Sequence, residues 1–434
     1  MNIKQIETQI KILFDCWFDE KSKQKLEKVR YAGPVLGKEE YSGMLDAIFD
    51  DWWSGGKYTL EAEEKLAKIS DRNHGLFVNS GSSADLLLMS AAKELYFEDG
   101  DKILTLACGF PTTVNPIIQN RLIPVFVDID LNEMSLNPDL LQEVLKKDKK
   151  IKGIFVAHTL GFVGDIDRIL NIARENNVQV FFDSCDAYSS TYKGKPVQAY
   201  GKASTFSFYP AHHCTSGEGG GIVTNDSEFF TVMRSFRGWG RWCASSNCCI
   251  RSVKPELFCP TQKFSKCTEM PDDYSVNYTY EFLGYNLKPL ELQAKILFHQ
   301  LDRLEHFHNI RVKNYNKLYD YFVKKNIPNI RLWKLEDNVC PFSFPILLPE
   351  NINRKHLIGH LSRRGIESRL LFGGNLIKQP AYAKKKQYWE TYGSFENSDK
   401  IMNNFIMLGV SQINDDSHID KVITEVDNFL SIGI

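Results

Sequence analysis

The chain lacks any run of 18 consecutive apolar residues, which is about the minimum length of a membrane-spanning helix. Its N-terminus, MNIKQIETQIKILFDCWFDE, carries charges throughout, whereas a secretory signal has a basic region followed by an apolar one. No basic block stands out, and the formal net charge is −1, so the electrostatic signature of a nucleic-acid-binding protein is missing. We therefore expect a cytoplasmic protein that binds neither membranes nor nucleic acid.

The composition, 43% hydrophobic and 25% charged, is ordinary for a globular protein. A chain of 434 residues is too long for one small core, so we expect one large domain and a smaller lobe. The predicted division is an N-terminal helical segment (1–74), a large α/β domain (75–327) and a small C-terminal α+β lobe (328–434). The large domain is expected to contain a cysteine-rich insert (238–275) and a long helix (290–323).

Apolar residues recur at helical spacing near the N-terminus, at Ile3, Ile6, Ile10, Leu13 and Trp17. This spacing predicts an amphipathic helix that packs against the body or against a partner subunit. Two further helices are expected over 39–53 and 60–70.

From residue 75 onward, short apolar segments alternate with helical patterns. The predicted strands are 75–78, 102–107, 123–129, 153–158, 178–183, 204–208 and 221–224. Such alternation predicts a largely parallel sheet with helices on both faces. Ligands of such sheets bind at the carboxyl ends of the strands, so residues that follow the strands are the candidate site.

Four segments that follow or flank strands contain candidate binding or catalytic residues. Gly81 and Ser82 open a helix, where free N–H groups and hydroxyls can bind a phosphate; a plain serine N-cap is the alternative. Phe110 could stack on a flat ring or be an ordinary core residue. Asp183 ends a strand, where a buried carboxylate requires a cationic partner. His212 precedes a glycine-rich loop (FSFYPAHHCTSGEGGGIVT, 206–224) and can transfer a proton near neutral pH, although such a loop can also be a simple tight turn.

The 206–224 segment resembles the cofactor-lysine segment of sugar aminotransferases of the DegT/DnrJ/EryC1 family, which have the aspartate-aminotransferase fold (fold type I). Their pattern is Ser-Phe, three residues, Lys, then Gly-Glu-Gly-Gly. Here His212 stands where the lysine is expected, and an imidazole cannot form a Schiff base with pyridoxal phosphate. Family members with this replacement are pyridoxamine-phosphate-dependent 3-dehydrases of nucleotide-linked 4-keto-6-deoxyhexoses.

The resemblance implies a role for each candidate residue. Ser82, with Gly81, and Ser207 would hold the phosphate of pyridoxamine 5′-phosphate, and Phe110 would stack on its ring. Asp183 would pair with the pyridine nitrogen. The remaining implied roles are Asp186 near the ring hydroxyl, Asn286 reaching the cofactor phosphate of the partner in a homodimer, and His212 removing a proton from the cofactor's 4′ carbon. Arg369 could clamp a substrate phosphate or simply pair with a surface acid.

The implied activity is removal of the C3 hydroxyl of a nucleotide-linked 4-keto-6-deoxyhexose, in the synthesis of 3,6-dideoxysugars for surface polysaccharide such as O-antigen. The resembled reaction is completed by an NADH-dependent flavin/iron–sulfur reductase, or by hydrolysis without a cluster. A sugar aminotransferase and a non-catalytic relative are the alternative functions. Residue patterns alone identify neither the nucleotide nor the stereochemistry of the sugar.

Five of the ten cysteines lie within residues 243–267, which in a cytosolic enzyme favours a metal over disulfides. One dehydrase subgroup carries a [2Fe-2S] cluster. Two segments of this chain, Asp-Ser-Cys185-Asp-Ala and Gly-Arg-Trp-Cys243, resemble the sequence motifs of that subgroup. Ser245 stands where that subgroup has its next cysteine. The expected ligands are Cys185, Cys243, either Cys248 or Cys249, and Cys259, with a zinc site or free thiols as the alternatives.

Overall fold

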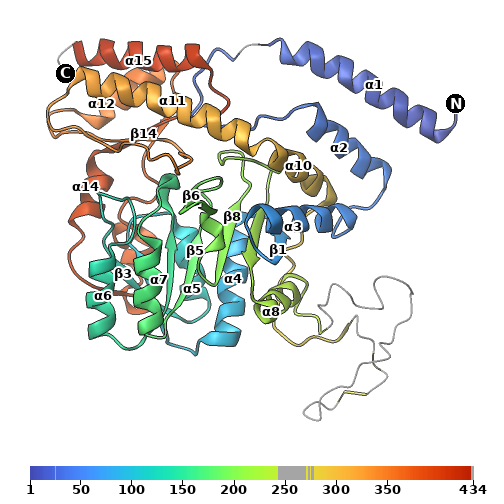
Figure 1. Ribbon diagram of the computed structural model, residues 1–434, viewed down its shortest axis with the longest axis horizontal. Helices are drawn as coiled ribbons and strands as arrows, with labels where there is room; N and C mark the ends of the chain where they lie inside the picture. The colour runs from blue at the N-terminus through green and yellow to red at the C-terminus, as the bar shows by residue number, and fades with distance from the viewer. Residues whose placement is uncertain (25, 243–269, 272–273, 275–277, 432–434) are drawn as a thin grey trace.

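A computed structural model describes residues 1–24, 26–242, 270–271, 274 and 278–431 (Figure 1). Its centre is an eight-stranded sheet with the order β1-β9-β8-β5-β4-β2-β3-β13. Strand β9 is antiparallel to β1 and β8, and the other neighbours pair in parallel. The strands are β1 (His74–Val78), β2 (Lys102–Leu106), β3 (Ile123–Val127), β4 (Ile151–Ala157), β5 (Gln179–Asp183), β8 (Ala203–Ser207), β9 (Gly220–Thr224) and β13 (Glu390–Thr391). The predicted α/β class with a mostly parallel sheet is confirmed.

Helices cover both faces of this sheet because its strands are apolar on both sides. In β5, Phe181 packs into the cluster under α4 and α8, and Phe182 into the cluster under α6 and α7. The helices on the two faces are α4 (Gly81–Tyr96), α5 (Pro111–Gln119), α6 (Pro138–Lys147), α7 (Ile166–Glu175) and α8 (Ser227–Arg237). A two-stranded hairpin, β6 (Thr191–Tyr192) and β7 (Lys195–Pro196), follows β5.

The region predicted as one helix over 290–323 forms two consecutive helices, α10 (Glu291–Asp302) and α11 (Leu304–Lys325). They meet at Arg303, whose backbone is not helical. Helix α10 packs against α2 (Lys38–Phe49) and α3 (Lys57–Ile69), whereas α11 runs on into the C-terminal part of the protein (Figure 1).

Helix α1 (Ile3–Ser22) extends from the body and has no buried residue (Figure 1). It contacts α2 through an aromatic group in which Phe14, Trp17 and Phe18 surround Tyr41, and through an ion pair between Lys11 and Asp46. The predicted packing against the body is therefore a contact with α2 in which no side chain of α1 is buried. Among the described residues, no helix is both long and apolar enough to cross a membrane.

The C-terminal lobe contains an antiparallel sheet with the order β10-β11-β14-β12. Its elements are β10 (Arg331–Leu332), β11 (Phe344–Leu347), α12 (Arg354–Arg363), β12 (Ser368–Arg369), α13 (Pro380–Ala383), α14 (Glu396–Asn404), β14 (Phe405–Leu408) and α15 (Asp416–Ser431). Strand β13 leaves this lobe and pairs with β3 at the edge of the large sheet.

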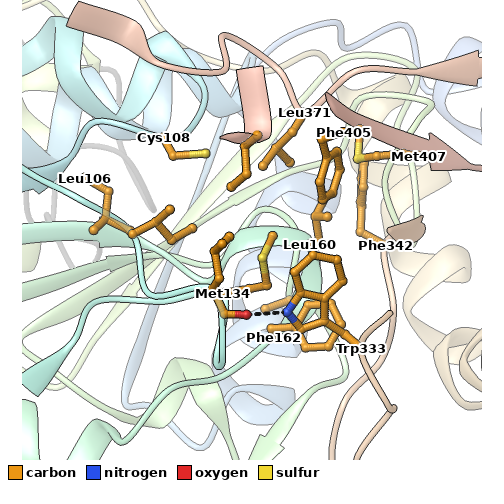
Figure 2. Packing of buried hydrophobic residues seen from close by; sticks show 14 of the residues in the cluster. Leu106, Cys108, Met134, Leu160, Phe162, Trp333, Phe342, Leu371, Phe405 and Met407 are labelled. Carbon is orange, nitrogen blue, oxygen red and sulfur yellow. Dashed lines mark hydrogen bonds between the residues drawn. The ribbon is translucent and has the colours of Figure 1, made fainter. Parts of the chain in front are cut away.

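One apolar cluster joins the lobe to the large domain. Figure 2 shows Trp333 of the lobe beside Met134 and Phe162 of the large domain, and Phe405 of the lobe belongs to the same cluster, its ring centroid 5.9 Å from that of Trp333. The indole N–H of Trp333 donates to the carbonyl of Leu131 at 2.6 Å. The lobe therefore lies in a fixed position beside the carboxyl ends of the large sheet's strands.

Candidate active site

A cleft of about 680 Å³ opens at the carboxyl ends of the central strands. Residues from the ends of β4, β5 and β8 line it, together with the first turns of α4 and α5. The opposite wall consists of residues 30–34 and side chains of the C-terminal lobe, including Arg369 and Phe372. The cleft lies where the predicted sheet topology places a ligand.

His212 lines this cleft, and its backbone N–H donates to the carbonyl of Tyr209 at 3.0 Å. Its side chain is about 15% exposed, and its Nδ1 atom has no hydrogen-bond partner among the described residues. Burial lowers the pKa of His212 to about 4, because an imidazolium loses its hydration in the protein interior. The imidazole is therefore neutral near pH 7 and can accept a proton.

Asp186 lies on the other side of the imidazole. Its Oδ1 atom is 3.7 Å from Nδ1 of His212, which is too far for a hydrogen bond. Its Oδ2 atom accepts the N–H of Leu160 at 3.2 Å. Burial, and then the charge of Asp183, raise the pKa of Asp186 to about 8. Asp186 therefore faces the candidate base as a largely protonated carboxyl at neutral pH.

Asp183 ends β5 at the floor of the cleft and is 5% exposed. Its Oδ2 atom accepts the hydroxyl of Thr113 at 2.7 Å, and Oδ1 accepts the N–H of Cys185 at 3.1 Å. Both donors are neutral, and no ion pair of Asp183 occurs within the described residues. A buried carboxylate without a cation is costly, so the floor of the cleft suits a cationic ligand atom.

Asp85 of α4 lies behind this carboxylate, fully buried. Its Oδ1 atom accepts the hydroxyl of Thr205 at 2.6 Å. Burial, and then the charge of Asp183, raise the pKa of Asp85 well above its usual range. Burial therefore favours the neutral form of Asp85 beside Asp183. The sequence analysis did not identify Asp85, because its acidic side chain gives no local sign of burial.

The N-terminus of α4 meets the cleft through Gly81 and Ser82. Ser80 caps the helix by accepting the N–H of Ser83 at 3.0 Å, which leaves the amides of Gly81 and Ser82 in the first turn, where no intrahelical acceptor is available. A Cβ atom on Gly81 would lie 2.5 Å from Cβ of Ser207. Glycine is therefore required for the approach of α4 to Ser207, and the three residues form one anion-compatible corner.

Phe110 caps α5 at the mouth of the cleft and is 49% exposed, so it is not a core residue. Its ring meets that of Phe372 edge to face, with centroids 5.7 Å apart. Asn286 does not line the cleft; its side chain accepts a hydrogen bond from Lys288 at 2.5 Å. Arg369 lines the cleft, and its guanidinium is 3.4 Å from Glu367.

The sequence analysis missed the wall formed by residues 30–34. Tyr31 is buried there, and the guanidinium of Arg369 lies over its ring, 5.4 Å from the centroid. The Gly33-Pro34 pair is the only local signal of a turn in this segment. Its place in the cleft depends on contacts with the far end of the chain, such as the bond from Asn414 to the carbonyl of Arg30.

Of the predicted cluster ligands, Cys185 lines the cleft. The other four, Cys243, Cys248, Cys249 and Cys259, lie outside the described residues. Within the part of the chain that the structure describes, no three His, Cys, Asp or Glu side chains are grouped so as to hold a metal ion. The predicted iron–sulfur cluster therefore gains no support from the described residues.

The sequence profile of the DegT/DnrJ/EryC1/StrS aminotransferase family matches residues 34–427. The chain is 36% identical to the lipopolysaccharide biosynthesis protein RfbH of Salmonella typhimurium, over 93% of this chain and 92% of that protein. It is 32% identical to the dTDP-4-dehydro-2,6-dideoxy-D-glucose 3-dehydratase of Saccharopolyspora spinosa, over 93% of this chain and 87% of that protein.

Among solved structures, the fold is similar to that of Escherichia coli GDP-4-keto-6-deoxy-D-mannose-3-dehydratase with bound hydrated PLP. The TM-score is 0.80 at 25% sequence identity, and the match covers 92% of this chain and all of that one.

Proposed function

Because the chain belongs to the DegT/DnrJ/EryC1/StrS aminotransferase family, we propose that it removes the C3 hydroxyl of a nucleotide-linked 4-keto-6-deoxyhexose. The proposed cofactor is pyridoxamine 5′-phosphate, held without a covalent bond. Two similar proteins are named as 3-dehydratases of nucleotide-linked keto sugars, and the 36% identical RfbH is named for lipopolysaccharide biosynthesis. We extend both the sugar class and that biosynthetic role to this chain.

One observation carries the proposal: no lysine is found among the described residues that line the cleft, and a neutral imidazole lies there instead. An aminotransferase of this fold needs a lysine that forms a Schiff base with the cofactor. An imidazole cannot form that bond but can serve as a general base. The cleft is therefore better suited to proton transfer at a free cofactor than to transamination.

The residues of the cleft fit this cofactor. Asp183, a buried carboxylate without a described cation, would hold a protonated pyridine nitrogen. Ser82, with Gly81, and Ser207 would bind the phosphate at the N-terminus of α4, and the exposed ring of Phe110 would stack on the pyridine. When bound, the cofactor supplies an amine that can join a ketone and a ring that withdraws electrons.

The chain's own contribution is proton transfer and orientation. His212 would accept a proton at its imidazole, and the neutral carboxyl of Asp186 would lie beside it without adding a negative charge. Arg369, half exposed at the mouth, would attract the diphosphate of the substrate.

Two further parts of the proposal concern partners. We propose a homodimer in which Asn286 contacts the cofactor phosphate of the partner's site, consistent with its position away from the cleft of its own chain. We also propose two alternative completions of the reaction. A cluster on Cys185 and the cysteines beyond residue 242 would accept electrons from a flavin/iron–sulfur reductase; otherwise hydrolysis would complete the reaction, and glutamate would regenerate the amine.

The direct test supplies the cofactor-loaded protein with nucleotide-linked 4-keto-6-deoxyhexoses that differ in base and stereochemistry, with either glutamate or a reductase system present. We expect mass spectrometry and NMR to show loss of the C3 oxygen from one of them. A product that instead gains an amino group at C4 would favour the aminotransferase.

Borohydride treatment of the protein loaded with pyridoxal phosphate gives a second measurement. Without a cofactor lysine, the intact mass of the chain should stay unchanged after denaturation. A stoichiometric increase by the mass of the reduced cofactor would contradict the proposed absence of a covalent bond.

A further inference from the structure

The turn that follows β4 contains a buried hydroxyl at the wall of the cleft. Thr159 lines the cleft and is 1% exposed. Its Oγ1 atom has no hydrogen-bond partner within the described residues. Because buried hydroxyls of native proteins are nearly always hydrogen-bonded, an unpaired one at the wall of a cleft indicates a group that meets a ligand.

The backbone of this turn is strained. Leu160 is fully buried and has a φ of 58°, in the left-handed region that residues other than glycine seldom adopt. Gly161 has a φ of 91°, and a Cβ atom there would lie 2.3 Å from the carbonyl oxygen of Cys340. Strained backbone of this kind is concentrated at binding and catalytic sites. The conformation of the turn therefore supports a function for Thr159 that is independent of its missing partner.

Two hydrogen bonds join this turn to the residues at the end of β5. The N–H of His158 donates to the carbonyl of Asp183 at 3.0 Å, and the N–H of Leu160 donates to Oδ2 of Asp186 at 3.2 Å. Thr159 lies between these two donors in the chain. Its position relative to the floor of the cleft is therefore fixed by the backbone on both sides.

The order of the strands indicates which group of the ligand Thr159 meets. This step rests on the proposed function, in which Asp183 holds the pyridine nitrogen and Ser207, with the N-terminus of α4, holds the phosphate. Strand β5, which ends at Asp183, lies between β8, which ends at Ser207, and β4, which precedes Thr159.

The chemical structure of pyridoxamine 5′-phosphate completes the argument. Its phosphate arm and its ring hydroxyl lie on opposite sides of the line that joins the ring nitrogen to the carbon bearing the aminomethyl group. A ring with its nitrogen at β5 and its phosphate toward β8 therefore directs its hydroxyl toward β4 and Thr159.

We propose that Thr159 is a binding residue for the ring hydroxyl of the cofactor. Its Oγ1–H donates a hydrogen bond to the ring oxygen and thereby fixes the rotation of the ring within the cleft. The ring is then held at three points, by Asp183 at its nitrogen, by the phosphate corner, and by Thr159 on the side away from the phosphate.

The test removes the hydroxyl and keeps the shape of the side chain. Thr159→Val retains the branched side chain, and it should fold with unchanged thermal stability in the cofactor-free state, because it breaks no bond with the described residues. Thr159→Ser is the conservative variant that retains a hydroxyl. Ser204→Ala is the matched control, because Ser204 of β8 is also fully buried with an unpartnered hydroxyl but does not line the cleft.

The measurement is equilibrium dialysis of each variant with pyridoxamine 5′-phosphate and with its 3-deoxy analogue, which lacks the ring hydroxyl. We expect the original chain to bind pyridoxamine 5′-phosphate more tightly than the analogue. Thr159→Val should reduce this preference by about tenfold or more, since the hydrogen bond lost is one to a polar ring oxygen. Thr159→Ser and Ser204→Ala should retain it. A change confined to one ligand is the mark of a direct contact.

An unchanged preference in Thr159→Val, or an equal loss of affinity for both ligands, would overturn the assigned contact. Dialysis requires no turnover, so this inference and the proposed reaction can fail separately. If the preference is lost as expected but no sugar is dehydrated, the role of Thr159 holds and the proposed function fails. If the original chain binds neither ligand, the proposed cofactor and the role of Thr159 are both wrong.

Discussion

At the scale of single residues, the cleft gives different environments to two carboxyls, Asp183 and Asp186, that are only three residues apart in the sequence. Asp183 accepts two hydrogen bonds from neutral donors, whereas Asp186 accepts one, and its burial together with the charge of Asp183 raises its pKa. Two nearby carboxyls do not ionise independently. The outcome is a largely protonated carboxyl of Asp186 beside the candidate base.

His212→Asn tests the base directly. Because asparagine cannot accept the proton, turnover should fall by roughly 10²–10⁴-fold, while cofactor binding, measured by absorbance after gel filtration, should persist. His360→Asn, in α12 of the C-terminal lobe, is the control and should keep turnover close to that of the original chain. Near-normal turnover of His212→Asn would remove His212 from the mechanism.

The raised pKa of Asp186 predicts that the stability of the cofactor-free protein depends on pH. Its pKa is about 8 in the folded state and about 4 in the unfolded state. Between these values Asp186 is protonated in the folded state and ionised in the unfolded state. Its contribution to the free energy of unfolding is therefore fully present below about pH 4 and is lost as the pH rises toward 8.

Asp186→Asn should remove this pH-dependent loss of stability. Relative to the original chain, the variant should gain up to about 1 kcal/mol of unfolding free energy per pH unit between about pH 5 and 8, measured by urea denaturation. A stability difference that does not change with pH would contradict a protonated Asp186.

At the scale of elements, the N-terminus of α4 depends on its close contact with the end of β8. A Cβ atom at position 81 would lie 2.5 Å from Cβ and 3.1 Å from Cα of Ser207. Because part of this obstacle is backbone, a rotamer change cannot relieve it. The two elements that would hold the phosphate can be this close only with glycine at position 81.

Gly81→Ala should therefore push α4 away from Ser207 and weaken cofactor binding by about tenfold or more, since overpacking typically costs about 1–3 kcal/mol. Equilibrium dialysis with pyridoxamine 5′-phosphate measures the change. Gly359→Ala is the control: in α12 the added Cβ would meet only the flexible end of Arg363, and alanine favours a helix. Equal affinities of both variants would exclude the proposed phosphate corner.

Cys185, which lines the cleft, is the one predicted cluster ligand that lies within the described residues. If the insert supplies the remaining ligands of a cluster, anaerobically purified protein should contain two irons and two sulfides per chain, as the [2Fe-2S] prediction requires. Cys185→Ser should then lose them while retaining the amine cofactor. Cys16→Ser, at an exposed cysteine of α1, should keep both. Iron-free protein with full activity after attempted reconstitution would favour the hydrolytic completion.

The predictable elements are those whose pattern is local. The apolar segments 204–208 and 178–183 indicated strands, and parallel topology brought their ends together. The direction of β9 was not predictable, because the period of a strand is the same in both directions. Strand β13 was missed because Glu390 and Thr391 are exposed and polar, and the break at Arg303 has no proline or glycine nearby to indicate it.

At the scale of the whole molecule, the least predictable residues are those that join distant parts of the chain. The buried guanidinium of Arg311, in α11, donates hydrogen bonds to Gln412, 101 residues later in the chain, and to the carbonyl of His212, 99 residues earlier, and nothing local distinguishes it from an exposed arginine on an amphipathic helix. Trp333 and Phe405 likewise became part of a shared core only when the lobe packed on the large domain. The sheet is thus a local property of the sequence, whereas the cleft is a property of the complete fold.

The wall formed by residues 30–34 is held in place by residues near the C-terminal end of the chain. Asn414 donates to the carbonyl of Arg30 at 2.7 Å, and a Cβ atom on Gly409 would lie only 2.5 Å from the carbonyl oxygen of Tyr31. During translation, the early segment emerges from the ribosome long before the residues that secure it. A nascent chain can therefore form much of the central sheet, but it cannot close the cleft until residues 409–414 have left the exit tunnel. Cofactor capture consequently belongs to the end of synthesis, and a ribosome stalled before this point would hold a chain with an open cleft.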